Sequence, residues 1–337
     1  MVGGWFGPWV GPASAHTVGG VAATDYRTRI TARAEPFPGV TVAPVDSGNQ
    51  LELTNDAARD VVVIGYDGEP YLRVGPRGVF ENRNSPATYL NRSRLSPAPP
   101  PDRADPEADP SWRRVGDGPS VRWHDHRAHW MGTSDPPAVR RDPDRAQLIQ
   151  RFTVPVVRGD RTVRVRGDVS WIPGPSPWPW IGVAVVLAVA VVVLARTRRA
   201  PVAIGTALAL TLVAAVVHAA GSWTTGSAST GGRIGAAVPT LGAVVLGGVA
   251  LALLARRGLR AAAPLLVFAG LFVTIAIGLA DLSALSHSQV PTVLPVGLDR
   301  ATITLALGLG AGVTVGAALH VTDRRPREGP TDPSGQE

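Results

Sequence analysis

Three of the chain's seven histidines lie within the stretch VRWHDHRAHWM, residues 121–131. If this stretch is extended, His124 and His126 point to one face at the i, i+2 spacing, and His129 follows where a turn can bring it back. Imidazole rings that converge on one point bind a transition metal, and Asp125 can orient one of them through a hydrogen bond. The spacing therefore predicts a metal site.

The same stretch also fits a structural role. In that case the histidines hydrogen-bond to the loop backbone, Arg127 pairs with a nearby carboxylate, and Trp123 and Trp130 bury the apolar side of the segment. General-base catalysis would need a nucleophile and a pocket that the sequence does not identify. The metal and structural roles both stay open at this point.

The start of the chain predicts an export signal. Residues 1–15 end in an A-x-A pattern that fits cleavage before His16, although the apolar stretch is short and an uncleaved segment is the alternative. A mature N-terminal histidine offers an α-amine beside its imidazole, and the pair can chelate one metal ion. Because the chain has no cysteine, a metal site must be built from nitrogen, oxygen or methionine sulfur, and imidazole ligands suit copper(II) or zinc(II). The predicted ligands are His16, His124, His126 and His129, with Met131 as an axial ligand.

Alternation of apolar and polar residues predicts β-strands in two blocks, 27–75 and 147–172. Short strands separated by Pro, Gly, Asn and Asp turns are typical of an antiparallel sandwich, here of the immunoglobulin-like or cupredoxin-like kind over residues 16–175. The Pro- and Asp-rich segment 82–146 is predicted to be an irregular insertion. This insertion contains the three clustered histidines.

The second half of the chain predicts an all-α transmembrane domain over residues 176–322. Its five apolar runs each come near the roughly 20 residues that cross about 30 Å of hydrocarbon, so the lipid bilayer is a predicted partner. The runs are Trp180–Ala195, Val202–Ala220, Ile234–Ala255, Ala261–Leu282 and Ala301–Val321. In the last run, Gly308, Gly312 and Gly316 repeat every fourth residue and predict a helix-packing surface.

Arginine gives the predicted orientation, because the chain contains no lysine. Arginines gather in segments 196–199 and 256–260 and in the tail 323–337, whereas the alternate loops hold only Arg233 and Arg300. The positive-inside rule then predicts a multi-pass protein of the cell membrane, with the β domain outside and a disordered cytoplasmic tail. These arginines largely account for the net charge of +7, so nucleic acid is not a predicted partner.

Three ionisable residues fall on the predicted outer side of the helices: His218 near the end of the second run, Asp281 at the end of the fourth, and His287 in the loop that follows. An ionisable residue in or near a bilayer indicates function by default, so a relay at the membrane surface is one interpretation. Simple solvent exposure at the interface is the alternative, above all for Asp281 and His287.

An N-terminal histidine, an exported sandwich and a multi-helix membrane part together give a layout that resembles the CopC/CopD and YcnJ group of bacterial copper-handling proteins. The resemblance covers the whole chain as a layout, and His16 is the one residue with a counterpart in that group. It implies an exported sandwich that binds copper through its N-terminal histidine and is coupled to a membrane module. A metal-delivering or metal-receiving envelope protein is then an expected partner.

We therefore expect an integral membrane protein, not an enzyme, whose exported domain binds a divalent metal for transport or delivery. One alternative is a non-catalytic envelope protein that binds a partner through its sandwich and uses the histidines structurally. Another is a membrane-tethered metalloenzyme, in which Asp125 or the acidic loop supplies an acid or base. No phosphate-binding loop or nucleotide-binding glycine pattern is present.

Overall fold

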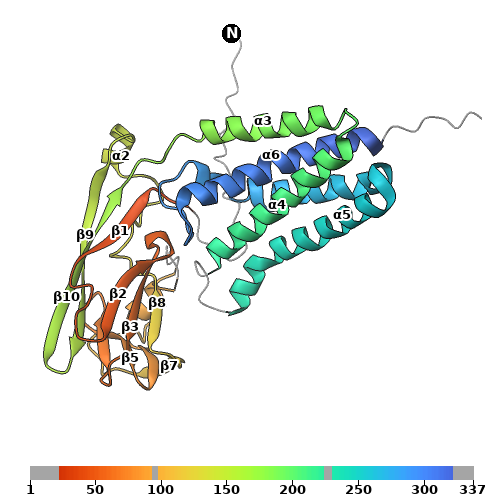
Figure 1. Ribbon diagram of the computed structural model, residues 1–337. Helices are drawn as coiled ribbons and strands as arrows, with labels where there is room; N and C mark the ends of the chain where they lie inside the picture. Colours follow the sequence, from red (N-terminus) through yellow and green to blue (C-terminus); the bar gives the residue numbers. More distant parts are fainter. Residues whose placement is uncertain (1–22, 93–97, 224–229, 322–337) are drawn as a thin grey trace, which may run out of the picture.

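The computed structural model describes residues 23–92, 98–223 and 230–321, which form a β part followed by a helical part (Figure 1). The antiparallel β character of the first part and the helical character of the second are confirmed. The predicted signal segment, His16 and the predicted cytoplasmic tail lie outside the described residues.

The strands of the β part form two antiparallel sheets. One has seven strands in the order β1-β10-β9-β4-β5-β6-β7, and the other has three in the order β2-β3-β8. Their bounds are β1 Tyr26–Ala32, β2 Val40–Val45, β3 Gln50–Asn55, β4 Val61–Ile64, β5 Pro70–Gly75, β6 Gly78–Asn82, β7 Trp112–Gly116, β8 Ser120–Trp123, β9 Gln147–Arg158 and β10 Arg161–Trp171.

One apolar core is shared by both sheets. The period-two alternation of β3 sends Leu51 and Leu53 inward, where they join a buried cluster with Val63 of β4 and Val154 of β9. The division into seven and three strands differs from the four and three of an immunoglobulin constant domain. The immunoglobulin-like or cupredoxin-like subtype therefore stays a prediction.

The segment 82–146 is more regular than predicted. Within it, β7 pairs with β6 at the edge of the large sheet, β8 pairs with β3 in the small sheet, and two short helices form, α1 Ala87–Leu90 and α2 Pro137–Arg141. Strands this short carry little alternation, so the surrounding Pro and Asp residues obscured them. As a result, β8 fixes the start of the histidine stretch against the core.

The helical part comprises α3 Trp178–Leu194, α4 Ala200–Ser222, α5 Thr230–Val273 and α6 Val296–Val321. A π-helical segment, η2 Thr274–Leu279, continues α5, and a 3-10 turn, η3 Leu282–Leu285, follows it. In the described residues, three helices are long and apolar enough to cross a membrane: Ala200–Ser222, Ala237–Leu279 and Val296–Val321. Helix α3 is apolar but shorter.

Helix α5 is folded back on itself. A Cβ atom built on Gly242 would lie 3.3 Å from the ring of Phe272, whereas one straight helix would separate these residues by roughly 45 Å. The reversal occurs at Gly258, where φ is 78° and ψ is 174°, a conformation that glycine adopts most easily. The predicted runs Ile234–Ala255 and Ala261–Leu282 are the two arms of this hairpin.

Helix α6 packs against α3, α4 and α5, and its glycine face is confirmed as a packing surface. A Cβ atom on Gly308 would lie 2.5 Å from the carbonyl oxygen of Ala184, and one on Gly312 would lie 2.8 Å from Cβ of Val191. The absence of these Cβ atoms lets the backbones of α3 and α6 approach closely. Position 316 meets Ala195 in the same way.

The two ends of the helical part differ in composition. At the end that faces the β part, called here the β-facing end, lie the start of α3, the end of α4, the turn η3 and the start of α6 (Figure 1). At the opposite end, called the arginine end, lie the exposed arginines of segments 196–199 and 256–260. At the arginine end, the ring of His320 joins α6 to the end of α3 through a hydrogen bond of 2.9 Å with the carbonyl oxygen of Ala195.

Candidate functional site

Three ionisable side chains meet at the β-facing end of the helices. His218 lies one turn before the end of α4, Asp281 follows the π-helical segment η2, and Asp299 lies in the first turn of α6. A π-helical turn changes the angular position of the residues that follow it, and such turns are frequent at functional sites. We call His218, Asp281 and Asp299 the membrane triad.

His218 stands between the two carboxylates. Its Nδ1 atom lies 2.9 Å from Oδ1 of Asp299, and its Nε2 atom lies 3.3 Å from Oδ2 of Asp281. The exposed fraction of the side chain falls along the series, from 30% for Asp281 through 14% for His218 to 1% for Asp299. The triad thus runs from a partly exposed carboxylate to a buried one.

This geometry requires shared protons. A neutral imidazole has one N–H donor and one nitrogen lone pair, and a lone pair that faces an ionised carboxylate is repulsive. The contacts are satisfied when both ring nitrogens carry protons, or when one ring nitrogen accepts from a protonated carboxyl. In either state the three groups hold two protons and a net charge of −1.

The surroundings of Asp299 stabilise its negative charge only in part. The N-terminus of α6 stabilises a negative charge in its first turn, where Asp299 lies. However, its Oδ2 atom is buried and has no hydrogen-bond partner among the described residues. A buried acceptor without a donor costs free energy, so this oxygen is the unsatisfied atom of the triad.

His287, predicted as part of the relay, is not part of the triad. Its Nδ1 atom lies 2.8 Å from the carbonyl oxygen of Ser283 and 3.3 Å from the hydroxyl of Ser286. Its own carbonyl oxygen accepts a hydrogen bond from Nη2 of Arg300. His287 therefore holds the loop between η2 and α6, whereas His218 and Asp281 meet directly.

Sequence reasoning missed Asp299. In the sequence it stands beside Arg300 at the start of the last apolar run, where an acid and a base suggest a solvated loop. The signal was its position: an acidic residue in the first turn of a helix that is otherwise packed on several sides.

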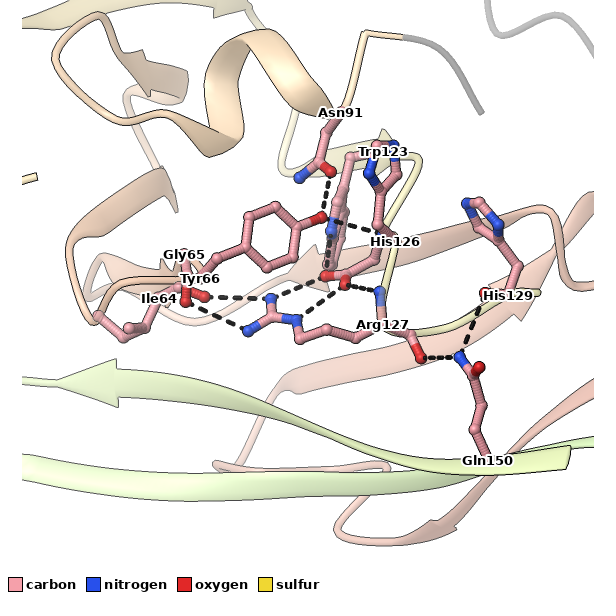
Figure 2. Close-up of polar contacts among 10 residues, drawn as sticks. Ile64, Gly65, Tyr66, Asn91, Trp123, His126, Arg127, His129 and Gln150 are labelled. Carbon is pink, nitrogen blue, oxygen red and sulfur yellow. Dashed lines mark hydrogen bonds and ion pairs between the residues drawn. The ribbon is translucent and has the colours of Figure 1, made fainter. Parts of the chain in front are cut away.

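The histidine stretch in the β part is built around a buried ion pair (Figure 2). Asp125 is fully buried and accepts hydrogen bonds from Nε and Nη2 of Arg127 at 2.8 and 2.9 Å, and from the indole of Trp123 at 2.9 Å. Burial alone raises the pKa of the Asp125 carboxyl, but the hydrogen bonds and charge of Arg127 outweigh it, so this pKa lies below its ordinary value.

Arg127 extends the ion pair into the large sheet. Its guanidinium donates to the carbonyl oxygens of Ile64 and Gly65, both at 3.2 Å, and lies over the ring of Tyr66 (Figure 2). Tyr66 in turn accepts a hydrogen bond of 2.9 Å from the backbone N–H of His126. These contacts tie the histidine stretch to β4 and its following turn.

The rings of the three histidines lie in different surroundings. The ring of His124 lies 3.1 Å from the Gln50 amide nitrogen and 3.1 Å from the Asn49 carbonyl oxygen. The rings of His126 and His129 meet edge to face, with centroids 5.6 Å apart, and His129 is buried. Met131 is partly buried. Within the described ranges, no group of three or more His, Cys, Asp or Glu residues is arranged to hold a metal ion.

No protein-family model, curated protein or solved structure matches the chain.

The Asp125–Arg127 pair is expected to stabilise the β part. Replacing Asp125 by alanine leaves the guanidinium of Arg127, whose side chain is only 20% exposed, without its anionic partner. We expect the free energy of unfolding to fall by about 3–5 kcal/mol. Chemical denaturation of the purified protein at neutral pH measures the loss. Because the pKa of Asp125 is lowered, its stabilising contribution is present at neutral pH and is lost as the pH falls through the folded-state value.

Asp117 provides the matched control. It pairs with Arg114 at 3.0 Å, but its side chain is 89% exposed, so Asp117→Ala should change stability by less than about 1 kcal/mol. An equal effect of the two substitutions would show that Asp125 does not anchor the stretch.

Proposed function

We propose that the chain is a multi-pass membrane protein whose activity depends on a proton taken up at the membrane triad from the side of the β part. The observation that carries the proposal is the position of His218, whose two ring nitrogens each face a carboxylate. Histidine can accept a proton at one ring nitrogen and release one from the other. Asp281 is then the entry group, His218 the shuttle and Asp299 the buried acceptor.

The triad has the character of a binding site more than of a continuous proton path. After Arg300, whose guanidinium donates to the loop before α6, the next polar residues of α6 are Thr302 and Thr304. Their hydroxyls donate to the carbonyl oxygens of Asp299 and Arg300. Thr211 of α4 is likewise bonded to its own helix. A proton that reaches Asp299 can therefore leave only through His218 until the helices rearrange, as coupling of proton uptake to a conformational change requires.

We also propose five membrane crossings: α3, α4, the two arms of α5, and α6. Large aliphatic side chains on the outside of these helices support the proposal, since Val186, Val202, Val213 and Val245 are exposed in the protein and suit a lipid environment. The exposed arginines at the arginine end support a cytoplasmic location for that end. The β part is then outside the cell, of the sandwich type expected from the sequence.

Single cysteines test this topology, because the chain has none of its own. Asp117→Cys lies in the β part and Thr197→Cys lies between α3 and α4. A membrane-impermeant maleimide applied to intact cells should label the first variant and should label the second only after permeabilisation. Labelling of Thr197→Cys alone in intact cells would reverse the proposed orientation.

Carbodiimide labelling tests the proton site. Dicyclohexylcarbodiimide reacts with protonated carboxyl groups in apolar surroundings, so it should modify Asp299, and the modification should decline as the pH rises. Asp299→Asn should abolish the labelling, whereas Asp117→Asn should leave it unchanged. Labelling of Asp299 that does not depend on pH, or none at all, would contradict the proposal.

Metal capture by the β part is the second candidate function, and the ring contact between His126 and His129 is the observation that favours it. Two neighbouring imidazoles suit copper(II) or zinc(II), and His16 would add an α-amine and a third ring. The contacts of His124 give it a structural role instead, so the proposed ligand set is smaller than the one predicted from the sequence.

Titration of the full chain with copper(II) tests this candidate. One ion per chain should bind, and binding should be lost in the variant His126→Ala/His129→Ala but kept in His124→Ala. Binding that is the same in both variants, or no stoichiometric binding in the wild type, would exclude the site.

A further inference from the structure

We propose that Asp25 and Arg300 are positioning residues of the membrane triad: the β part, docked on the loop between η2 and α6, holds Asp281 against His218. This inference rests on the proposed proton site. It assigns to the β part a direct influence on proton uptake, through a loop that is fixed from two sides.

Arg300 fixes the loop from the helical side. Its Nε atom donates to the carbonyl oxygen of Ala284 at 3.0 Å, and its Nη2 atom donates to that of His287 at 2.8 Å. Hydrogen bonds from a charged donor are stronger than neutral ones. Because Arg300 directly follows Asp299 in α6, the loop that carries Asp281 is anchored beside the buried carboxylate.

The β part fixes the same loop from the other side. Thr24 and Gln289 exchange two backbone hydrogen bonds of 2.9 and 2.8 Å, and the backbone N–H of Ser288 donates to Oδ1 of Asp25 at 2.7 Å. The carbonyl oxygen of Asp25 accepts from the N–H of Ile172, which follows β10. Asp25 thus joins the end of the large sheet to the loop.

Close packing makes this contact specific. A Cβ atom at Gly174 would lie 1.8 Å from the carbonyl oxygen of Ser286 and 3.0 Å from Oδ1 of Asp25. The backbone of the connector between β10 and α3 therefore touches the loop, and no larger residue fits there. The segment before β1 and the connector after β10 therefore contact the loop at the same place.

Asp281 is the member of the triad whose position depends most on the loop. His218 and Asp299 lie on helices, whereas Asp281 lies where η2 gives way to the loop, and it is the most exposed member of the triad. Release of the loop should therefore move Asp281 first. The other charged or titratable groups described on the loop and the elements packed against it are His287, Arg300 and Asp25.

Asp25→Ala removes the carboxylate that accepts a hydrogen bond from the N–H of Ser288, and it leaves the three residues of the triad unchanged. The expected result is a shift of about one unit in the pH midpoint of carbodiimide labelling at Asp299, a tenfold change in proton affinity. Asp117→Ala should leave the midpoint unchanged. Thermal melting of each variant, measured in parallel, separates this effect from general destabilisation.

A disulfide provides the rescue. Antiparallel residues that exchange two hydrogen bonds have Cα atoms about 5.5 Å apart, within the reach of a disulfide. In the Asp25→Ala background, oxidised Thr24→Cys/Gln289→Cys should restore the wild-type midpoint, and reduction should remove the rescue. An unchanged midpoint in Asp25→Ala, or no rescue on oxidation, overturns the inference alone. Absence of pH-dependent labelling in the wild type overturns both this inference and the proton site.

Discussion

The contacts of His218 with two carboxylates are the constraint on which the helical part depends. In a low-dielectric environment an isolated charge is expensive, and a pair of carboxylates without protons between them is more so. One imidazole that bridges both groups lets the end of α4, the end of η2 and the start of α6 meet at one point. The glycine face of α6 serves the same arrangement, because close packing against α3 leaves α6 little freedom to withdraw Asp299.

The buried carboxylates of the β part and of the helical part differ in how completely they are hydrogen-bonded. In the β part, Asp125 and Arg127 form a pair whose hydrogen bonds are directed to fixed partners, so the pair holds the stretch in one conformation. In the helical part, the Oδ2 atom of Asp299 has no hydrogen-bond partner among the described residues, and this atom belongs to the proposed proton site. The first arrangement stabilises structure, and the second can change state.

The sequence predicted what depends on local periodicity. Apolar runs located the helices, arginine spacing separated the two ends, and the glycine repeat identified the face of α6 that packs against α3. The strands β6, β7 and β8 lie outside the predicted blocks, because each has at most five residues and the Pro, Gly and Asp residues around them obscure the alternation. Two of the triad's three residues, His218 and Asp281, were singled out together with His287 by their place at a membrane boundary. The contact of His218 with Asp299 depends on tertiary packing, which sequence spacing does not show. The even spacing of His124 and His126 suggested that both bind one metal ion. Asp125 between them is instead the residue that organises the stretch.

The most direct measurement is a pH titration of the carboxyl C=O infrared band in the wild-type protein and in His218→Gln. If the three groups titrate as one unit, the wild type shows a band that Asp299→Asn removes. The pH midpoint of this band moves in His218→Gln, because the imidazole that links the two carboxylates is gone. A band with the same midpoint in the wild type and in His218→Gln would show that Asp299 titrates independently of His218, and the proposed proton site would be wrong.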